Sequence, residues 1–234
     1  MTSDAGEQLP LLFGNYDYRL DSLVKDPHLE VANAVEDFAQ KRRPGLIYLW
    51  GGSGVGKTHL LQAACAYAAA ANYRPAYLPL SRAVEDLDVE ICDGLESVDL
   101  IAIDDVQSIS KQSDWEEALF ALFNRLWDAE RRIIVSADKP PTSLAFNLND
   151  LSSRLSWGIT FNLRNVDDTE KLGIMQAHAR DRGFQLPEET GKFLIDRAPR
   201  DLGELCGYIA MLDHASLARQ RKLTIPFVKE ILKL

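Results

Sequence analysis

The residues from Gly51 to Thr58 carry a pattern that binds polyphosphate. They read GGSGVGKT, a full match to the phosphate-loop pattern GxxxxGK followed by Ser or Thr. Glycines let backbone amides turn inward around an anion, and the positive end of a following helix favours that anion. The pattern predicts that Lys57 contacts the β- and γ-phosphates and that Thr58 binds Mg²⁺, within a cofactor-binding set formed by Gly52, Ser53, Gly54, Val55, Gly56, Lys57 and Thr58.

Two adjacent carboxylates end a second apolar run, LIAIDD, from Leu100 to Asp105. A P-loop protein places its Walker B acid at such a strand end. Asp104 is therefore expected to hold the magnesium shell, and Asp105 to polarise a water against the γ-phosphate. The alternative is a pair of solvated carboxylates that cap the next helix, and the phosphate loop makes it the less favoured interpretation.

Three later residues complete the candidate chemistry. Asp138 follows another apolar run, which in an open α/β sheet would bring it to the carboxyl edge beside the phosphates. Arg154 precedes the last expected strand, and Arg200 begins a helix further on. Phosphoryl transfer recruits arginine to stabilise charge on the γ-phosphate, in cis or from a neighbouring molecule. Either arginine alone would be read as a surface or salt-bridging residue, and it is their order that favours a catalytic role.

These residues need a parallel sheet to bring them together, and the sequence predicts one. Apolar runs alternate with helical patterns, as in an α/β fold. Helices are expected at 57–72, 84–95, 114–130 and 150–155, and strands at 45–50, 76–80, 100–104, 132–136 and 159–163. After about Val166 only helical patterns remain, at 168–181, 188–196, 201–219 and from 224 onward. The fold class is therefore α/β, with a P-loop domain containing a five-stranded parallel sheet, followed by a small all-α domain.

Composition narrows the function classes. The chain has 234 residues, of which 46% are hydrophobic, and no apolar stretch is long enough to span a bilayer. The three cysteines are far apart and lack paired histidines, so neither a disulfide framework nor a zinc site is expected, and reduced thiols in the cytosol fit best. A formal charge of −9 argues against a broad nucleic-acid surface.

The N-terminal segment has apolar residues with no neighbouring core pattern. It reads EQLPLLFG from Glu7 to Gly14, and Pro10 argues against a central strand. Either it folds back as an edge segment, or it is a linear peptide that fills another protein's pocket.

Five motifs in order resemble the AAA+ module of the bacterial replication initiator DnaA. They are GGSGVGKTHLL from Gly51, IDDVQ from Ile103, VSAD from Val135, SRLSWG from Ser153 and PRDLGE from Pro199. The resemblance implies that Asp138 is sensor I, Arg154 an arginine finger supplied to a neighbouring subunit, and Arg200 sensor II of the helical lid. It also implies an adenine pocket around 15–23. His59 matches the family's loop, and a polar role at the helix N-terminus is favoured for it over a contact with the nucleotide.

The absence of a helix-turn-helix domain after the lid makes the chain similar to the Hda family of DnaA-like regulators. That resemblance implies a domain division into residues 1–14, 15–165 and 166–234. The first would be an extended peptide for the sliding clamp of DNA polymerase III, with the contacts made by Gln8, Leu9, Leu11, Leu12 and Phe13.

The function expected from this resemblance is negative regulation of replication initiation. A cytoplasmic protein that holds ADP or ATP and Mg²⁺ would bind the clamp and insert Arg154 in trans into a DnaA-type initiator, whose ATP is then hydrolysed. No sequence-specific DNA contact and no membrane contact are expected, whereas self-association stays open. Two alternatives remain: an active AAA+ ATPase of helicase-loader type, and a non-catalytic clamp-binding adaptor.

Overall fold

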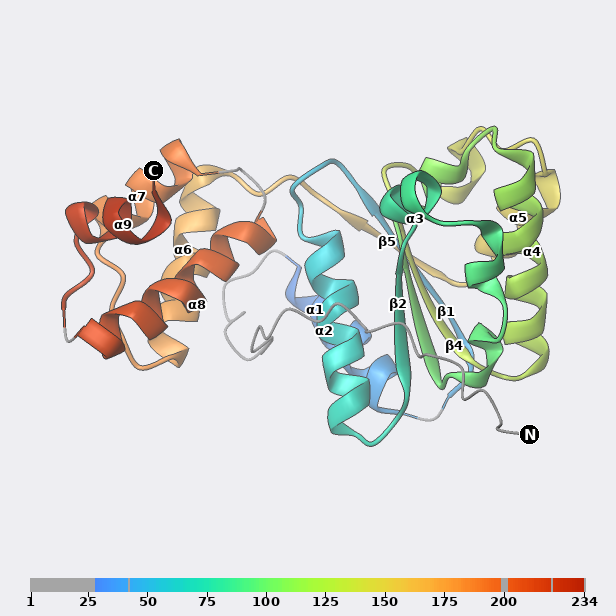
Figure 1. The fold of residues 1–234 in the computed structure, drawn as a ribbon, viewed down its shortest axis with the longest axis horizontal. Coiled ribbons are helices and arrows are strands. Elements are labelled where there is room, and N and C mark those ends of the chain that lie inside the picture. The colour runs from blue at the N-terminus through green and yellow to red at the C-terminus, as the bar shows by residue number, and fades with distance from the viewer. Residues whose placement is uncertain (1–27, 42, 199–201, 220, 234) are drawn as a thin grey trace, which may run out of the picture.

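The computed structural model describes residues 28–41, 43–198, 202–219 and 221–233 (Figure 1). The expected clamp peptide, the expected adenine pocket around 15–23 and Arg200 lie outside these residues. Within the described part of the chain, no helix is both long and apolar enough to cross a membrane.

A five-stranded parallel sheet forms the centre of the larger part. Its order is β2-β3-β4-β1-β5, which confirms the expected parallel sheet. The strands are β1 (Gly45–Gly51), β2 (Pro75–Pro79), β3 (Leu100–Asp104), β4 (Arg132–Ala137) and β5 (Ile159–Leu163). Because all strands run the same way, the segments that follow β1, β3 and β4 meet at one edge of the sheet.

Helices cover both faces of the sheet (Figure 1). Alternate strand residues point to opposite faces, so Ile47 and Leu49 pack with α1 and α2, whereas Leu46 and Tyr48 pack with α4. The helices on the first face are α1 (Leu29–Gln40) and α2 (Lys57–Ala70), and those on the second are α3 (Leu80–Asp86), α4 (Ser113–Asp128) and α5 (Asn149–Leu155). The apolar face expected for α4 is buried, from Trp115 to Leu126.

The C-terminal part is a helical lid with its own apolar core around Met175, Leu205 and Phe227. Its helices are α6 (Asp168–Asp181), α7 (Glu188–Arg197), α8 (Leu202–Arg219) and α9 (Ile225–Leu232), close to the expected ranges. The lid lies on the α1 and α2 side of the sheet (Figure 1). The fold therefore places lid helices near the loop between β1 and α2.

One helix differs from its prediction. A helix was expected at 84–95, but α3 starts directly after β2 and ends at Asp86, and two short 3₁₀ helices follow, Val89–Cys92 and Leu95–Ser97. Gly94 interrupts the expected range with a left-handed φ of 77°, which a continuous helix does not allow. The apolar residues that predicted a single helix at 84–95 therefore belong to several short elements.

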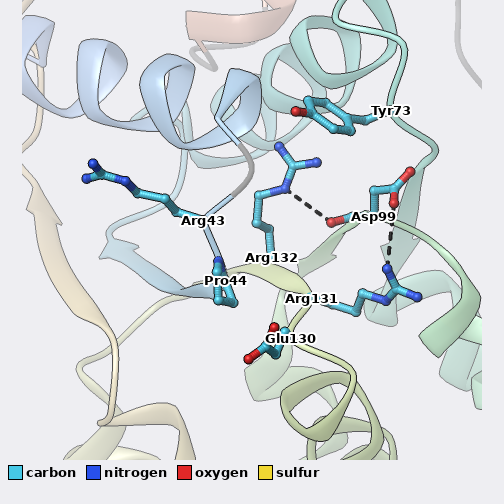
Figure 2. Close-up of a pocket in the computed structure, with 7 residues that line it drawn as sticks. All are labelled: Arg43, Pro44, Tyr73, Asp99, Glu130, Arg131 and Arg132. Atoms are coloured by element: carbon cyan, nitrogen blue, oxygen red, sulfur yellow. Dashed lines mark hydrogen bonds and ion pairs between the residues drawn. The ribbon is translucent and has the colours of Figure 1, made fainter.

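The amino ends of the strands are anchored by a buried arginine (Figure 2). Arg132 is 3% exposed and donates from Nη1 to the carbonyl oxygens of Ala39 and, at 3.1 Å, Lys41. Its Nε donates to the carbonyl of Asp99 at 3.2 Å, and its guanidinium lies 4.1 Å from the ring centre of Tyr73. Because the last carbonyls of a helix have no partner within the helix, Arg132 fixes the C-terminus of α1 to β4.

Candidate nucleotide site

The phosphate loop connects β1 to α2 at the carboxyl edge of the sheet. Gly54 and Gly56 have φ values of 77° and 96°, a left-handed conformation that side chains disfavour. Gly51 must also be small, because an added Cβ would lie 2.3 Å from the carbonyl oxygen of Leu163 at the end of β5. Since α2 begins at Lys57, directly after the loop, its N-terminal amides and helix dipole favour an anion there.

Lys57 is folded back over its own loop. Its ammonium donates to the carbonyl oxygens of Gly51 at 2.9 Å and Gly52 at 2.8 Å, and the residue is 8% exposed. A buried ammonium needs such acceptors. The structure therefore places this cation at the phosphate loop, and its contact with phosphates stays a prediction.

Asp104 lies at the centre of a hydrogen-bond network at the end of β3. It is 3% exposed. Its Oδ2 accepts from the hydroxyl of Thr58 at 2.8 Å and from the phenol of Tyr77 at 2.7 Å, and its Oδ1 accepts from the hydroxyl of Ser136. Thr58 and Asp104 thus bring together the hydroxyl and carboxylate oxygens that Mg²⁺ prefers, so the residues fit that ion.

The Gln107 side chain links the other two candidate acidic residues, Asp105 and Asp138. Its amide donates to Oδ1 of Asp105 at 2.9 Å, and its Oε1 accepts from the backbone N–H of Asp138 at 3.2 Å. The N–H of Asp105 donates to Ser136 at 2.9 Å, and Asp105 adopts a left-handed φ of 58°. Such a conformation is uncommon outside glycine and is found at functional sites. The structure therefore joins the segments after β3 and β4 through Gln107.

Three residues of this network were not singled out from the sequence: Tyr77, Ser136 and Gln107. Burial, and then the Asp104 carboxylate, raise the pKa of the Tyr77 phenol above its ordinary value, so it acts as a hydrogen-bond donor. The sequence contained a signal for Ser136, because it is a polar residue inside the apolar run of β4. Tyr77 carried none, because its role depends on which strand lies beside β3.

The lid lies against the phosphate loop at one point and against the start of α2 at another. The backbone N–H of Leu202 on α8 donates to the carbonyl of Gly54 at 3.3 Å. The half-buried ring of His59, on α2, lies edge-on to His178 on α6, with ring centres 6.3 Å apart. His178 is 8% exposed, and burial, followed by the charge of Arg182, lowers its pKa to about 4. His59 therefore faces the lid, beside the residues expected to contact a nucleotide.

The connection from β5 to the lid is held by ion pairs and a helix cap. Asp167 and Glu170 form a capping box at the start of α6, and Arg164 donates to both carboxylate oxygens of Glu170, at 3.0 and 2.6 Å. These bonds, the one from Arg164 first, lower the pKa of Glu170 to about 2. His28 contacts the carbonyl of Arg164 at 3.1 Å. The start of the lid is thus fixed to the N-cap of α1.

Arg154 does not join the phosphate-loop residues. It is half-buried near the C-terminus of α5, before β5 begins, whereas the phosphate loop contacts the other end of β5 at Leu163. The two ends of this strand are about 13 Å apart at the usual rise per residue. The guanidinium lies 4.1 Å from the ring centre of Trp157. Arg154 therefore precedes the end of β5 that is distant from its own chain's phosphate loop.

Sequence and structure thus bring Gly52 to Thr58, Asp104, Asp105 and Asp138 to one edge of the sheet, whereas Arg154 lies on α5, next to α4. The residues that the structure describes contain no cluster of three His, Cys, Asp or Glu side chains that could hold a metal. The order of the sheet, the phosphate loop after β1 and the helical lid define the class of the protein as a P-loop protein of the AAA+ type.

Two family models match the chain, and together they cover nearly all of its described part. The bacterial DnaA ATPase domain matches residues 15–162, and the Hda lid domain matches residues 168–232. The chain therefore belongs to the bacterial DnaA family of ATPase domains, as a Hda/DnaA-like AAA+ protein.

Solved structures agree with this assignment. Domain III of the replication initiation protein DnaA from Thermotoga maritima is 26% identical, with a TM-score of 0.70 over 94% of this chain and 97% of that one. AMPPCP-bound DnaA from Aquifex aeolicus is 28% identical, with a TM-score of 0.57 over 82% of this chain, which spans 64% of the relative's length. The RuvB branch migration motor of Thermotoga maritima, at 14% identity and a TM-score of 0.55 over 87% of this chain and 67% of that one, shares the fold.

Proposed function

We propose that this chain is a negative regulator of replication initiation that stimulates ATP hydrolysis by a DnaA-type initiator. Arg154 would enter the initiator's nucleotide site as an arginine finger, and the initiator would lose its ATP-bound form. Fingers of this kind raise phosphoryl-transfer rates by about 10³ to 10⁵. Such a role belongs in the cytoplasm.

The observation that carries this proposal is the position of Arg154. The residue lies on α5, before the end of β5 that is opposite the phosphate loop, so it is poorly placed to act on a nucleotide of its own chain. Among the described residues, its recorded side-chain contacts are with the rings of Trp157 and Phe120 and include no carboxylate. A guanidinium held in this way is available for an anion of a neighbouring molecule.

The chain's own site would hold ADP or ATP. Lys57 would exchange its two loop carbonyls for phosphate oxygens, and Thr58 and Asp104 would hold Mg²⁺, whose charge would help neutralise the phosphates. Arg200 would reach the nucleotide from the lid. The relative from Aquifex aeolicus was solved with AMPPCP, which supports an adenine nucleotide here. We propose that ADP bound in this site fixes the position of the lid through the contacts at Gly54 and His59. A ligand that binds only the folded protein also stabilises the folded state.

The N-terminal peptide would attach the protein to the sliding clamp. We retain residues 1–14 as this peptide, 15–165 as the nucleotide-binding domain and 166–234 as the lid domain. Gln8, Leu9, Leu11, Leu12 and Phe13 would fill an apolar pocket of the clamp. Attachment to a clamp on DNA raises the effective concentration of Arg154 near the initiator without any added contact between the two proteins.

A second candidate function is favoured by the complete network around Asp104. Gln107 joins Asp105 to the backbone of Asp138 at the carboxyl edge of the sheet, which supports a role for these residues in positioning an attacking water, with ATP hydrolysed by the chain itself as in a protein of helicase-loader type. ATP turnover by the isolated protein that rises with single-stranded DNA would favour this candidate.

One experiment separates these functions and the non-catalytic adaptor. Initiator ATP hydrolysis is measured on clamp-loaded DNA with the wild type, with Arg154→Ala, and with a double variant that replaces Gln8 and Phe13 by Ala. We expect Arg154→Ala to bind the clamp and give no stimulation, and the double variant to need more protein for the same stimulation. Full stimulation by Arg154→Ala would overturn the proposal and leave the adaptor.

A further inference from the structure

Exposed apolar side chains gather around Arg154. Trp127 at the end of α4 and Trp157 after α5 are 38% and 48% exposed. The rings of Trp127 and Trp157 meet edge to face, with centres 5.2 Å apart, and both contact Phe123 beneath them. We call Trp127 and Trp157 the aromatic patch.

The aromatic patch differs from the other exposed apolar residues that the structure describes. Those are Leu29 on α1, Leu87 after α3, Ile159 on the α1 and α2 face of β5, and Met211 and Leu217 on α8. Single exposed apolar side chains are normal on protein surfaces, whereas a cluster of large ones marks an interaction site. Here the cluster contains two tryptophans, the residue type that with arginine dominates the energetics of protein interfaces.

The aromatic patch also holds the arginine. The Arg154 guanidinium lies over the ring of Trp157, with Phe120 at 5.8 Å on another side. Stacking on an aromatic face orients the guanidinium and leaves its N–H groups unpaired with carboxylates. The surface therefore presents the Arg154 guanidinium beside two aromatic rings, and its charge is complementary to a polyphosphate.

We propose that the aromatic patch docks onto the nucleotide-site face of the initiator's AAA+ module, around the point where Arg154 enters. This inference rests on the proposed function. Burial of Trp127 and Trp157 would supply the binding energy and exclude water, which strengthens the attraction between Arg154 and a phosphate. Trp157 would also act as a positioning residue for Arg154, whereas Trp127, which does not touch the arginine in the recorded contacts, would contribute only to docking.

The test compares Trp127→Ala and Trp157→Ala with the wild type in initiator ATP hydrolysis at increasing concentrations of this chain. Trp127→Ala should raise the half-saturating concentration by about tenfold or more and leave the maximal rate unchanged. Trp157→Ala should raise it similarly and also lower the maximal rate. Leu217→Ala, which removes a more exposed apolar side chain from the lid, should behave as the wild type. Thermal melts establish that each variant is folded.

A second readout does not depend on hydrolysis. Tryptophan fluorescence of this chain should shift to shorter wavelength when a tryptophan-free initiator module is added, because Trp127 and Trp157 leave water. The shift should persist in Arg154→Ala and be lost when Trp127 and Trp157 are both replaced by Phe.

The outcomes separate the two proposals. If the wild type stimulates hydrolysis and both Trp→Ala variants keep its half-saturating concentration, the docking inference is wrong and the proposed function stands. If the variants change only self-association of this chain, the aromatic patch binds a second copy and the inference is again wrong. If the wild type gives no stimulation, the proposed function fails and the inference with it.

Discussion

Tyr77 donates a 2.7 Å hydrogen bond from its phenol to Oδ2 of Asp104, the oxygen that also accepts the hydroxyl of Thr58. The two strands involved, β2 and β3, pair in register, with Pro79 opposite Asp104. Tyr77 on β2 and Ser136 on β4 both donate hydrogen bonds to the buried Asp104 carboxylate and so orient it. The orientation of the candidate magnesium ligand thus depends on residues of three neighbouring strands.

We expect Tyr77→Phe to weaken magnesium-dependent nucleotide binding. Loss of the phenol frees the Asp104 carboxylate to rotate, and loss of such an outer partner typically costs about 10-fold or more in metal affinity. The measurement is nucleotide affinity by calorimetry with Mg²⁺ and with EDTA. The difference should shrink in Tyr77→Phe and stay unchanged in Tyr208→Phe, a lid control. Equal Mg²⁺ dependence in Tyr77→Phe and the wild type would contradict a role for this bond.

The stability of the protein should fall as the pH is lowered from 6.5 toward 4, because of His178. Burial lowers the pKa of His178 from 6.5 to about 4, so between these values the unfolded chain binds a proton that the folded chain does not. Stability from the neutral ring is therefore complete above pH 6.5 and is lost as the pH falls, by up to about 3 kcal/mol. Urea unfolding at pH 7 and at pH 5 measures this loss in the free energy of unfolding.

The control for this effect is a pair of histidine variants. His178→Gln should reduce the loss of stability between pH 7 and 5, whereas His214→Gln, on the exposed side of α8, should leave it as in the wild type. The explanation fails if His178→Gln loses as much stability as the wild type over this range.

Arg132→Met should destabilise the protein by roughly 2 to 4 kcal/mol, because carbonyl oxygens at the end of α1 lose their buried charged donor. Arg131→Met removes a neighbouring, more exposed arginine whose ion pair with Asp99 is 3.6 Å long, and should cost less than about 1 kcal/mol (Figure 2). Urea unfolding of both variants at pH 7 compares them. Equal stability of the two would show that Arg132 is not the anchor.

The sequence predicted the sheet because its signals are local. Each strand is a short apolar run bounded by turn residues, and the phosphate loop lies between a strand and a helix that could be recognised separately. Helix α1 was missed although its buried Val31, Ala32, Val35 and Ala39 have helical spacing, so this signal was available. The strand order was not predictable, because it depends on packing between distant segments.

The site was predicted in the same uneven way. Lys57, Thr58, Asp104 and Asp105 belong to motifs in which spacing alone places the chemistry. The roles of Tyr77 and Gln107 follow only from which segments lie beside β3. The stack of Arg154 on Trp157 was within one short motif, yet the motif did not show that the arginine lies beside a cluster of exposed tryptophans.

The central claim is that Arg154 acts in trans, and single-turnover hydrolysis tests it most directly. Labelled ATP is bound to the initiator alone, this chain is added with ADP in its own site, and phosphate release is followed with the wild type, Arg154→Ala, Arg154→Lys and, as an exposed arginine elsewhere, Arg82→Ala. We predict rapid release with the wild type and Arg82→Ala, and loss of about 10³-fold or more of the stimulated rate with Arg154→Ala. Arg154→Lys should restore little, because an ammonium lacks the planar fork. Release by Arg154→Ala at the wild-type rate would contradict the account.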